Sequence, residues 1–351
     1  RRRERGPARP SRSARARLRA LVVRPPACHS VAVERGILFD VDPTILTIGP
    51  IELRWYGVCF AAMFWIGVVL FHRSTRRAGY SDELVKAYLP WLFVGMVLGA
   101  RLGHCLFYEP ERYLSDPIQI LMIWKGGLSS HGGTVGVLGS LFLFARFHGL
   151  RYVDLADRTT MPAAVAATLV RVGNLMNSEI VGARTELPFG FGFVRHDCAA
   201  LDLCDLFDRA GYAADPRFAE LVEATPLRHP TQIYEIALGL FVLGLMWGLD
   251  RRFGEERRPV GLLTGAFGMS YFGLRFFVEI FKARQALGEE AALTMGQYMS
   301  IPLFLIGLYL VVGALRRPEP AESIEIPAAF SSRPPAAAEG DRADCPGDQK
   351  A

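Results

Sequence analysis

The 351-residue chain is 51% hydrophobic and only 21% charged, and its net charge is +5. This composition argues against a pair of soluble domains. The basic residues lie where membrane topology would place them, so the charge indicates no nucleic-acid partner.

Residues 1–36 precede the first apolar block and are predicted to be a disordered or wrongly assigned N-terminal extension. Residues 1–24 contain ten arginines, and Pro25 and Pro26 interrupt the only apolar patch. No secretory cleavage pattern follows this patch. We therefore expect the folded protein to begin near Ile37.

Seven apolar blocks follow, of 16 to 22 residues each. This length matches the roughly 20 residues with which a helix crosses a hydrocarbon layer of about 30 Å. The blocks lack the alternation of barrel strands, so their backbone is expected to be helical. We predict an all-α, polytopic membrane bundle within residues 37–317, with about seven transmembrane helices near 56–71, 88–108, 132–147, 161–177, 232–249, 260–281 and 295–315.

The charges of the connecting segments predict the orientation of the bundle. Arginine and lysine gather in 72–87, 146–158 and 250–259, which we place in the cytoplasm by the positive-inside rule. The long loop 178–231 carries nine acidic residues and five arginines, which fits the outer side. An odd number of crossings then puts the N-terminus outside and the C-terminus in the cytoplasm. The tail 318–351, rich in Ala, Pro, Glu and Ser, is predicted to be disordered.

The six cysteines form no CxxC motif and no Cys/His cluster with metal spacing. The sequence therefore predicts no metal site and no cofactor. Cys198 and Cys204, both in the outer loop, are the only pair suited to a disulfide in an oxidising compartment. The sequence leaves open whether they are bonded or remain two thiols.

Ionisable side chains occur inside several apolar blocks, although such groups are costly in a membrane. At 100° per residue, Arg171, Asn174 and Asn177 fall within an arc of about 120° and share one helix face. Glu179 follows this face. A second face carries Tyr271, Arg275 and Glu279 at i, i+4 and i+8, where the last two side chains can pair.

Two explanations of these polar faces stay open, hydrogen bonding between helices and ligand binding. The sequence supports the two explanations equally for Asn177, Glu179, Gln232 and Glu279. For Arg171 and Arg275, binding is favoured, because two buried guanidinium groups with few buried carboxylates would attract an anion. A guanidinium offers a planar fork of donors that suits phosphate. The sequence thus predicts a phosphate, such as a phospholipid headgroup, at membrane depth.

His131 lies in a glycine-rich segment, 126–133, at the entry to the third block. Its four glycines would let the backbone approach a bound group. Glycine so near a helix start costs stability, and the sequence shows no packing that would offset it. We therefore expect His131 to be a general base at neutral pH rather than a structural histidine.

These motifs resemble the prolipoprotein diacylglyceryl transferase family, from about Ile37 to Arg316. The most specific match runs from Arg171 to Gly182 and fits the family signature R-x-G-N-x-x-N-x-E-x-x-G. Weaker matches, in the family's order, are 54–57, 127–133, 228–235, 274–281 and 295–302. The chain departs from common family residues at Ala100, His104, Val170 and Ser178, and the last of these replaces a frequent glycine.

The resemblance implies transfer of the diacylglyceryl group from phosphatidylglycerol to the lipobox cysteine of a prolipoprotein, with release of glycerol phosphate, in the bacterial inner membrane. It implies no cofactor. His131 would be the base, assisted by Tyr56 or Tyr234, while Arg171 and Arg275 hold the phosphate. The other residues expected to bind phosphatidylglycerol are Asn174, Asn177, Glu179, Gly182 and Glu279. A small-solute transporter and an inactive lipid-binding paralogue are the alternatives.

Overall fold

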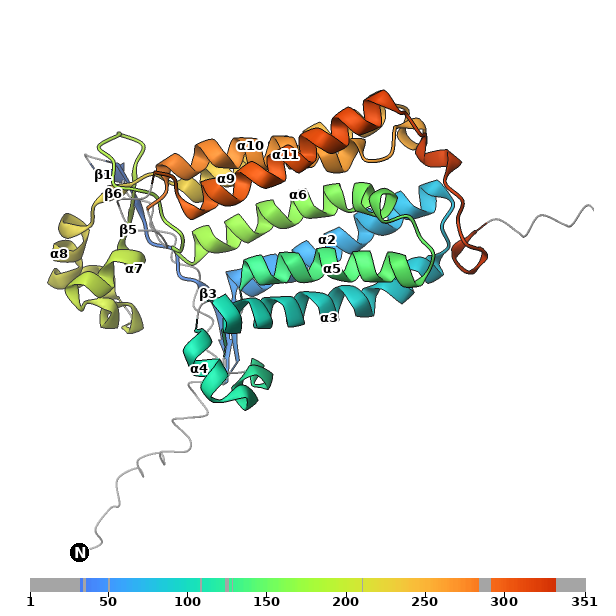
Figure 1. The fold of residues 1–351 in the computed structure, drawn as a ribbon. Coiled ribbons are helices and arrows are strands. Elements are labelled where there is room, and N and C mark those ends of the chain that lie inside the picture. The colour runs from blue at the N-terminus through green and yellow to red at the C-terminus, as the bar shows by residue number, and fades with distance from the viewer. Residues whose placement is uncertain are drawn as a thin grey trace, which may run out of the picture. The chain divides into compact units, whose positions relative to one another are not determined.

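The computed structural model describes residues 32–33, 36–49, 51–107, 109–123, 126–127, 129–209, 211–283 and 292–332. The described chain divides into two compact units. The first unit comprises residues up to 68 together with 160–251 and 262–313, and the second comprises 69–159, 252–261 and 314 onwards. Each unit is described by itself, and the elements are labelled in Figure 1.

Seven long helices cover the seven predicted apolar blocks. Four of them, α2, α3, α9 and α11, are long and apolar enough to cross a membrane, and α5 is a shorter apolar helix. The prediction is thus confirmed for a mainly helical chain with four helices that could span a membrane, while the count of seven spans and their orientation stay predictions. The seven helices are α2 (Trp55–Ala78), α3 (Asp82–Phe107), α5 (Ser130–Phe147), α6 (Tyr152–Met176), α9 (Thr231–Arg252), α10 (Leu262–Val278) and α11 (Met295–Arg316).

The helices extend into the segments that were predicted to be basic loops, so the loops are shorter than expected. Arg158, assigned to a cytoplasmic loop, instead lies inside α6 and is buried. Its Nη2 donates to Asp154 at 2.8 Å and to Glu256 at 2.9 Å. Arg158 therefore forms a structural ion pair. It is weaker evidence than a free loop arginine for which side of the membrane this segment faces.

Close contacts between small residues join the helices of the first unit. A Cβ added to Gly239 of α9 would lie 2.3 Å from Oγ1 of Thr168 on α6, and one added to Gly265 of α10 would lie 2.7 Å from the Gly307 carbonyl oxygen on α11. In lipid, burial of apolar surface does not drive helices together. Close van der Waals packing of this kind stabilises their association instead. Between α6, α9 and α10 lies a core of Ala164, Leu238, Val242, Met246 and Leu263.

The first unit also contains two small sheets, so the prediction of a wholly α-helical chain was wrong in this respect. The four-stranded sheet has the order β1 (Ala32–Val33), β2 (Gly36–Phe39), β5 (Phe191–Phe193), β6 (Leu227–Arg228). In it, β2 pairs in parallel with β5. A separate hairpin joins β3 (Thr44–Ile48) to β4 (Ile51–Arg54). Strands this short leave no period-2 pattern in the sequence.

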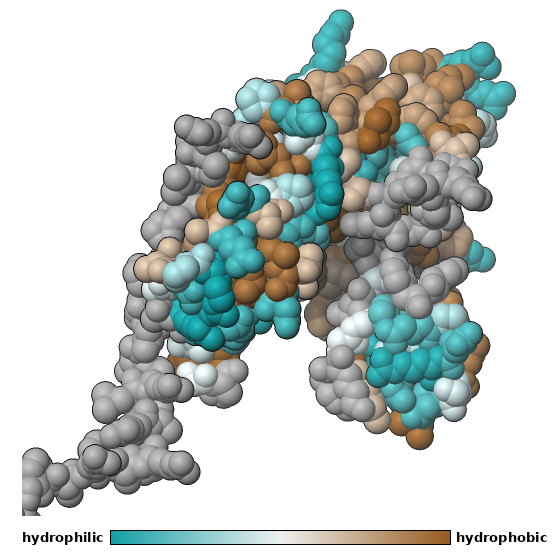
Figure 2. Space-filling view, turned by 90° about the vertical axis from the view of Figure 1, so that its left-hand side faces the viewer, coloured by the Kyte–Doolittle hydropathy of each residue, from teal (hydrophilic) through white to brown (hydrophobic). Residues whose placement is uncertain are grey.

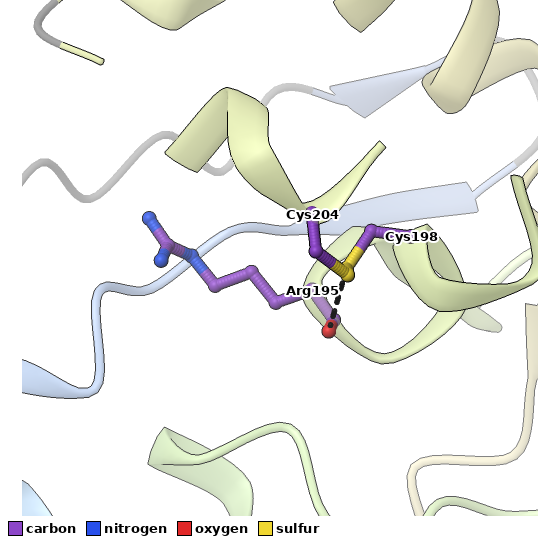
Figure 3. The surroundings of a disulfide bond; sticks show 3 residues. All are labelled: Arg195, Cys198 and Cys204. Carbon is purple, nitrogen blue, oxygen red and sulfur yellow. Dashed lines mark hydrogen bonds between the residues drawn. A yellow bond between two sulfur atoms is a disulfide. The ribbon is translucent and has the colours of Figure 1, made fainter. Parts of the chain in front are cut away.

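The long loop 178–231 folds around an apolar core of Val194, Cys198, Leu206 and Leu221, to which Leu38 of β2 also contributes. This part includes α7 (Val194–Asp197) and α8 (Pro216–Ala224). Cys198 and Cys204 form a disulfide with a Cα–Cα distance of 5.0 Å, which settles the question that the sequence left open (Figure 3). Beside it, Nε of Arg195 donates to Asp40 at 2.6 Å.

Two helices of the second unit, α3 and α5, pack through glycines over several turns. A Cβ added to Gly136 would lie 2.0 Å from the Gly95 carbonyl oxygen, and one added to Gly132 would lie 2.2 Å from that of Gly99. The expectation that the glycines near His131 lack a packing role was therefore wrong for Gly132. The glycines of α3 and α5 allow the backbones of these two helices to approach each other closely.

The first part of the C-terminal tail packs within the second unit. Its 3₁₀ turns η9 (Ala321–Ser323) and η10 (Ala328–Phe330) follow α11, and Phe330 is buried 5.4 Å from the His148 ring. The prediction of disorder from residue 318 is thus contradicted as far as residue 332. The rest of that prediction, and almost all of the predicted N-terminal extension, lie outside the described residues.

Many large apolar side chains of the helices are exposed, including Trp65, Phe241, Trp247 and Tyr309. On the face shown in Figure 2, hydrophobic residues alternate with hydrophilic patches. Exposed apolar surface of this extent on long helices is suited to contact with lipid rather than water.

Candidate functional site

The carboxylate of Glu235 on α9 connects the two arginines that the sequence singled out. Its Oε2 lies 3.0 Å from Nε of Arg171 on α6, and its Oε1 lies 3.0 Å from Nη1 of Arg275 on α10. All three side chains are at least four-fifths buried. The two guanidinium groups, 104 residues apart in the sequence, therefore meet at one carboxylate inside the first unit.

Lys282 adds a third cation, directly after the 3₁₀ turn η8 (Glu279–Phe281) that follows α10. Its Nζ lies 3.0 Å from Oε1 of Glu235 and 3.1 Å from Oε2 of Glu279. The predicted pair of Arg275 with Glu279 is present at 3.8 Å, which is longer than either lysine contact. Glu235 and Glu279 offset two of the three positive charges, so the surplus of buried positive charge is smaller than we expected.

The polar face of α6 continues this network toward Glu179. Nη1 of Arg171 donates to Oδ1 of Asn174 at 3.2 Å, and Nδ2 of Asn174 donates to Glu179 at 3.4 Å. Nδ2 of Asn177 donates to the other oxygen of Glu179 at 3.2 Å. Nε of Arg171 faces the Glu235 carboxylate and Nη1 donates to the Asn174 amide, so these two groups fix the guanidinium. Its Nη2 donates to none of the described residues.

The segment after α6 has an unusual backbone. Ser178 and Ile180 have φ angles of 53° and 55°, in the left-handed region. A β-branched residue rarely adopts this conformation, and such strain persists where the surrounding structure enforces it. The reversal at Ser178 lets Glu179 turn back toward the end of α6, where Asn174 and, just past the helix, Asn177 donate to it.

Gly182 holds this segment close to two others. Its N–H donates to the His229 carbonyl oxygen at 3.1 Å, and the next N–H, of Ala183, donates to that of Phe281 at 2.8 Å. A Cβ on Gly182 would lie 2.3 Å from the His229 carbonyl oxygen. The structure therefore gives Gly182 a main-chain packing role, which brings the start of α9 and the end of α10 together beside Lys282.

The two candidate tyrosines lie at different places in the first unit. Tyr56, at the start of α2, packs against α6, since a Cβ on Gly173 would lie 2.8 Å from its ring. This position is next to the face that carries Arg171 and Asn174. The Tyr234 hydroxyl lies 3.2 Å from Nδ1 of His229, and its ring faces Phe281. Tyr56 thus adjoins the polar face of α6, whereas Tyr234 contacts the rings of His229 and Phe281.

His131 lies in the first turn of α5, in the second unit. Its side chain is outside the described residues, so its predicted role stays a prediction. The helix start itself is well defined, because Oγ of Ser129 accepts from the Gly132 N–H at 3.2 Å as an N-cap.

No role was predicted from the sequence for Glu235 or Lys282. Glu235 stood out only as a charge in the fifth apolar block. Lys282 follows Glu279 by three residues, a spacing at which opposite charges meet on a helix, and this signal could have found it. For Gln232 the sequence left a structural role and a binding role open, and in the structure its Nε2 donates to the Glu179 carbonyl oxygen at 2.7 Å.

Taken together, these groups can bind an anion and orient hydroxyl groups. Three cations converge within the first unit, and arginine is suited to phosphate oxygens. Oδ1 of Asn177 and Oε1 of Gln232 are buried and accept no hydrogen bond from the described residues. Buried acceptors without a donor are costly, and a ligand with hydroxyl groups would satisfy them.

Comparison with known proteins agrees with this combination of motif and geometry. A family model described as prolipoprotein diacylglyceryl transferase matches residues 43–313. The phosphatidylglycerol–prolipoprotein diacylglyceryl transferase of Tolumonas auensis is 39% identical over 280 residues, which are 79% of this chain and 96% of that protein. Those of Chloroherpeton thalassium and Porphyromonas gingivalis are 35% and 34% identical, over 80% of this chain and 95% and 96% of their own lengths. This chain therefore belongs to the prolipoprotein diacylglyceryl transferase family.

Proposed function

We propose that this chain transfers the diacylglyceryl group of phosphatidylglycerol to a cysteine thiol of prolipoproteins, in the lipobox. The names of its relatives state the donor lipid and the acceptor protein. The observation that carries the proposal is the meeting of Arg171 and Arg275 at Glu235, between apolar helices. An anionic lipid headgroup is the ligand that such a site would meet in a membrane.

The reaction needs a nucleophile, a base and a stabilised leaving group. The substrate supplies the thiol, whose pKa of about 8.5 requires that a base remove the proton. The thiolate attacks the glyceryl carbon next to the phosphate ester, a carbon–sulfur bond forms, and the carbon–oxygen bond to phosphate breaks. The released glycerol phosphate keeps the electron pair, and fixed cations stabilise its charge.

We assign the phosphate to Arg171 and Arg275, with Lys282 as a third cation nearby. Nη2 of Arg171 is available to a phosphate oxygen while Nε stays on Glu235. The glycerol hydroxyls of the headgroup would donate to the open amide oxygens of Asn177 and Gln232. Asn174, Glu179 and Glu279 then orient the cations, and Gly182 keeps the three main-chain segments together.

His131 is proposed as the base that removes the thiol proton, with Tyr56 or Tyr234 assisting. Tyr56 is the better placed of the two relative to Arg171, because its ring packs on Gly173. An imidazole titrates near neutral pH, which suits a base for a thiol.

The proposed location is the bacterial inner membrane, with residues 37–317 as the transferase domain. All seven long helices cross the bilayer in this arrangement, with the N-terminus outside and the C-terminus in the cytoplasm. Two observations support it. Helices α2, α3, α9 and α11 have spanning length and apolarity. The outer loop contains a disulfide, which forms in oxidising compartments.

The test is a transfer assay with the full chain reconstituted in phosphatidylglycerol vesicles and a model prolipoprotein, read by mass spectrometry. We expect a mass gain of one diacylglyceryl group. The variants Arg171→Lys and Arg275→Lys, which keep the charge but lose the fork, and His131→Asn should each reduce the rate at least tenfold, as expected for a lost charge-stabilising or base group. Arg209→Lys, at an exposed arginine of the outer loop, is the matched control.

The outcomes separate the alternatives. A folded wild-type chain that binds the lipid without a mass gain on the prolipoprotein would be an inactive paralogue. Flux of a small solute without transfer would indicate a transporter. Near wild-type rates in all three site variants would refute the assignment of roles, even if the wild type is active.

A further inference from the structure

Arg101 is a buried arginine of α3 that the phosphate site does not use. It is 3% exposed, and its guanidinium lies 4.9 Å from the centre of the Tyr113 ring. Its hydrogen bonds go to main-chain carbonyl oxygens that precede α5, those of Gln119, Ile120, Met122, Gly126 and Gly127.

The geometry of these bonds requires arginine. Nε reaches the Ile120 oxygen at 2.8 Å, while Nη1 reaches that of Gly127 at 3.0 Å and Nη2 reaches that of Met122 at 3.3 Å. A guanidinium has five N–H donors in a rigid plane, whereas a lysine has three donors on a single nitrogen. Lysine at this position would therefore leave several of the carbonyls without a donor.

The neighbouring residues of α3 hold the start of α5. The Ser129 N–H donates to the Ala100 carbonyl oxygen at 2.8 Å. A Cβ on Gly103 would lie 2.6 Å from Cα of Gly132, so the two backbones touch at this level. Arg101 thus fixes the chain up to Gly127, and Ala100 fixes it at Ser129, two residues before His131.

We propose that Arg101 is a positioning residue of the transfer reaction, which sets the first turn of α5 and with it the place of His131. This inference rests on the proposed function, in which His131 is the base. A base has to lie within hydrogen-bond reach of the proton that it removes. A shift of about 1 Å in a reacting group can reduce a rate about hundredfold.

The first experiment compares Arg101→Lys with Arg112→Lys in the reconstituted full-length protein. Arg112 is the matched control, since it also lies over the Tyr113 ring but is exposed and pairs with Glu109. For Arg101→Lys we expect kcat to fall between about tenfold and hundredfold, with KM for phosphatidylglycerol within about threefold of wild type. Arg112→Lys should change neither constant.

Amide hydrogen exchange tests the positioning without relying on activity. Exchange should rise in peptides at the start of α5 in Arg101→Lys but not in α9 or α10, and it should be unchanged in Arg112→Lys. Unchanged exchange at the start of α5 would overturn the proposal. A uniform increase over all helices would also overturn it, because it would show a general loss of stability.

A double-substitution cycle tests whether Arg101 acts through His131. Arg101→Lys should slow the wild-type enzyme but not the His131→Asn variant, because residues that act as a unit have non-additive effects. The same fold-loss in both backgrounds would refute the proposal, as would wild-type activity of His131→Asn. If the wild type transfers no diacylglyceryl group, the proposed function fails, while the exchange comparison still tests the role of Arg101 in holding the helix start.

Discussion

Glu235 and Arg171, on α9 and α6, form an ion pair of 3.0 Å between a carboxylate oxygen and Nε. The second oxygen of the same carboxylate contacts both Arg275 and Lys282. One acidic side chain therefore fixes three cations from two other segments of the first unit. Its removal should affect both stability and phosphate binding.

Glu235→Gln should lower the free energy of unfolding by about 3 kcal/mol, since breaking a buried ion pair leaves buried charges without compensation. The amide keeps the size of the side chain and removes only its charge. Thermal unfolding in detergent at neutral pH measures the effect. Glu220→Gln, on the exposed side of α8, is the control and should change stability by less than about 0.5 kcal/mol. Equal stability of the two variants would show that the charge of Glu235 does not stabilise the cluster.

Ser178→Gly should raise the free energy of unfolding by about 1 kcal/mol, because the left-handed conformation costs a residue with a Cβ about 1 to 2 kcal/mol. Ser178 has a φ of 53° and a buried Oγ without a hydrogen-bond partner among the described residues. Ser178→Ala is the matched control, since it removes the hydroxyl and keeps the Cβ. Glycine should stabilise more than alanine in a thermal scan, and the reverse order would contradict the backbone argument.

The sequence predicted the features that a single helix determines. The shared face of Arg171, Asn174 and Asn177 follows from the 3.6-residue period alone, and the structure places all three in one network with Glu179. Ser178 was noticed as a departure from a common glycine, and its positive φ gives the physical reason for that glycine.

Features that depend on distant partners were missed. The parallel pairing of Ile37 with Phe191 joins segments more than 150 residues apart, and neither strand has a local signal. Gly132 was interpreted as part of a binding loop because its packing partner, Gly99, lies on another helix. Glu235 had no predicted role for the same reason, since its three partners come from α6 and from the end of α10.

Gly136→Ala should destabilise the protein by about 1 to 3 kcal/mol, the usual cost of forcing extra volume into a packed contact. The added Cβ would lie 2.0 Å from the Gly95 carbonyl oxygen, a main-chain atom that cannot move without shifting α3. Gly139→Ala is the matched control on the same helix, because a Cβ there meets nothing within 4 Å. Alanine has the higher helix propensity, so this control should be neutral or slightly stabilising. Equal losses in the two variants would exclude close α3–α5 packing as the cause.

The hydroxyl of Tyr212, in the long loop 178–231, donates to Oδ2 of Asp40 at 2.5 Å. Burial and the hydrogen bond to Asp40 raise its pKa to about 12, from 10.0 in an unperturbed tyrosine. A group whose pKa is raised in the folded state stabilises that state while it is protonated, so the contribution is complete below the unfolded pKa of about 10 and is lost as the pH rises toward 12.

The unfolding temperature of the wild type should therefore fall toward that of Tyr212→Phe over the range from about pH 10 to 12, because phenylalanine cannot lose a proton. Subtracting the two curves removes the titration of the other tyrosines and lysines, which both proteins share. A difference that stays constant across this range would mean that the Tyr212 proton does not stabilise the fold. Asp40→Asn tests the cause, since it keeps the acceptor oxygen and removes the charge. The pH-dependent difference should then become smaller, because one source of the raised pKa of Tyr212 is gone while its burial remains.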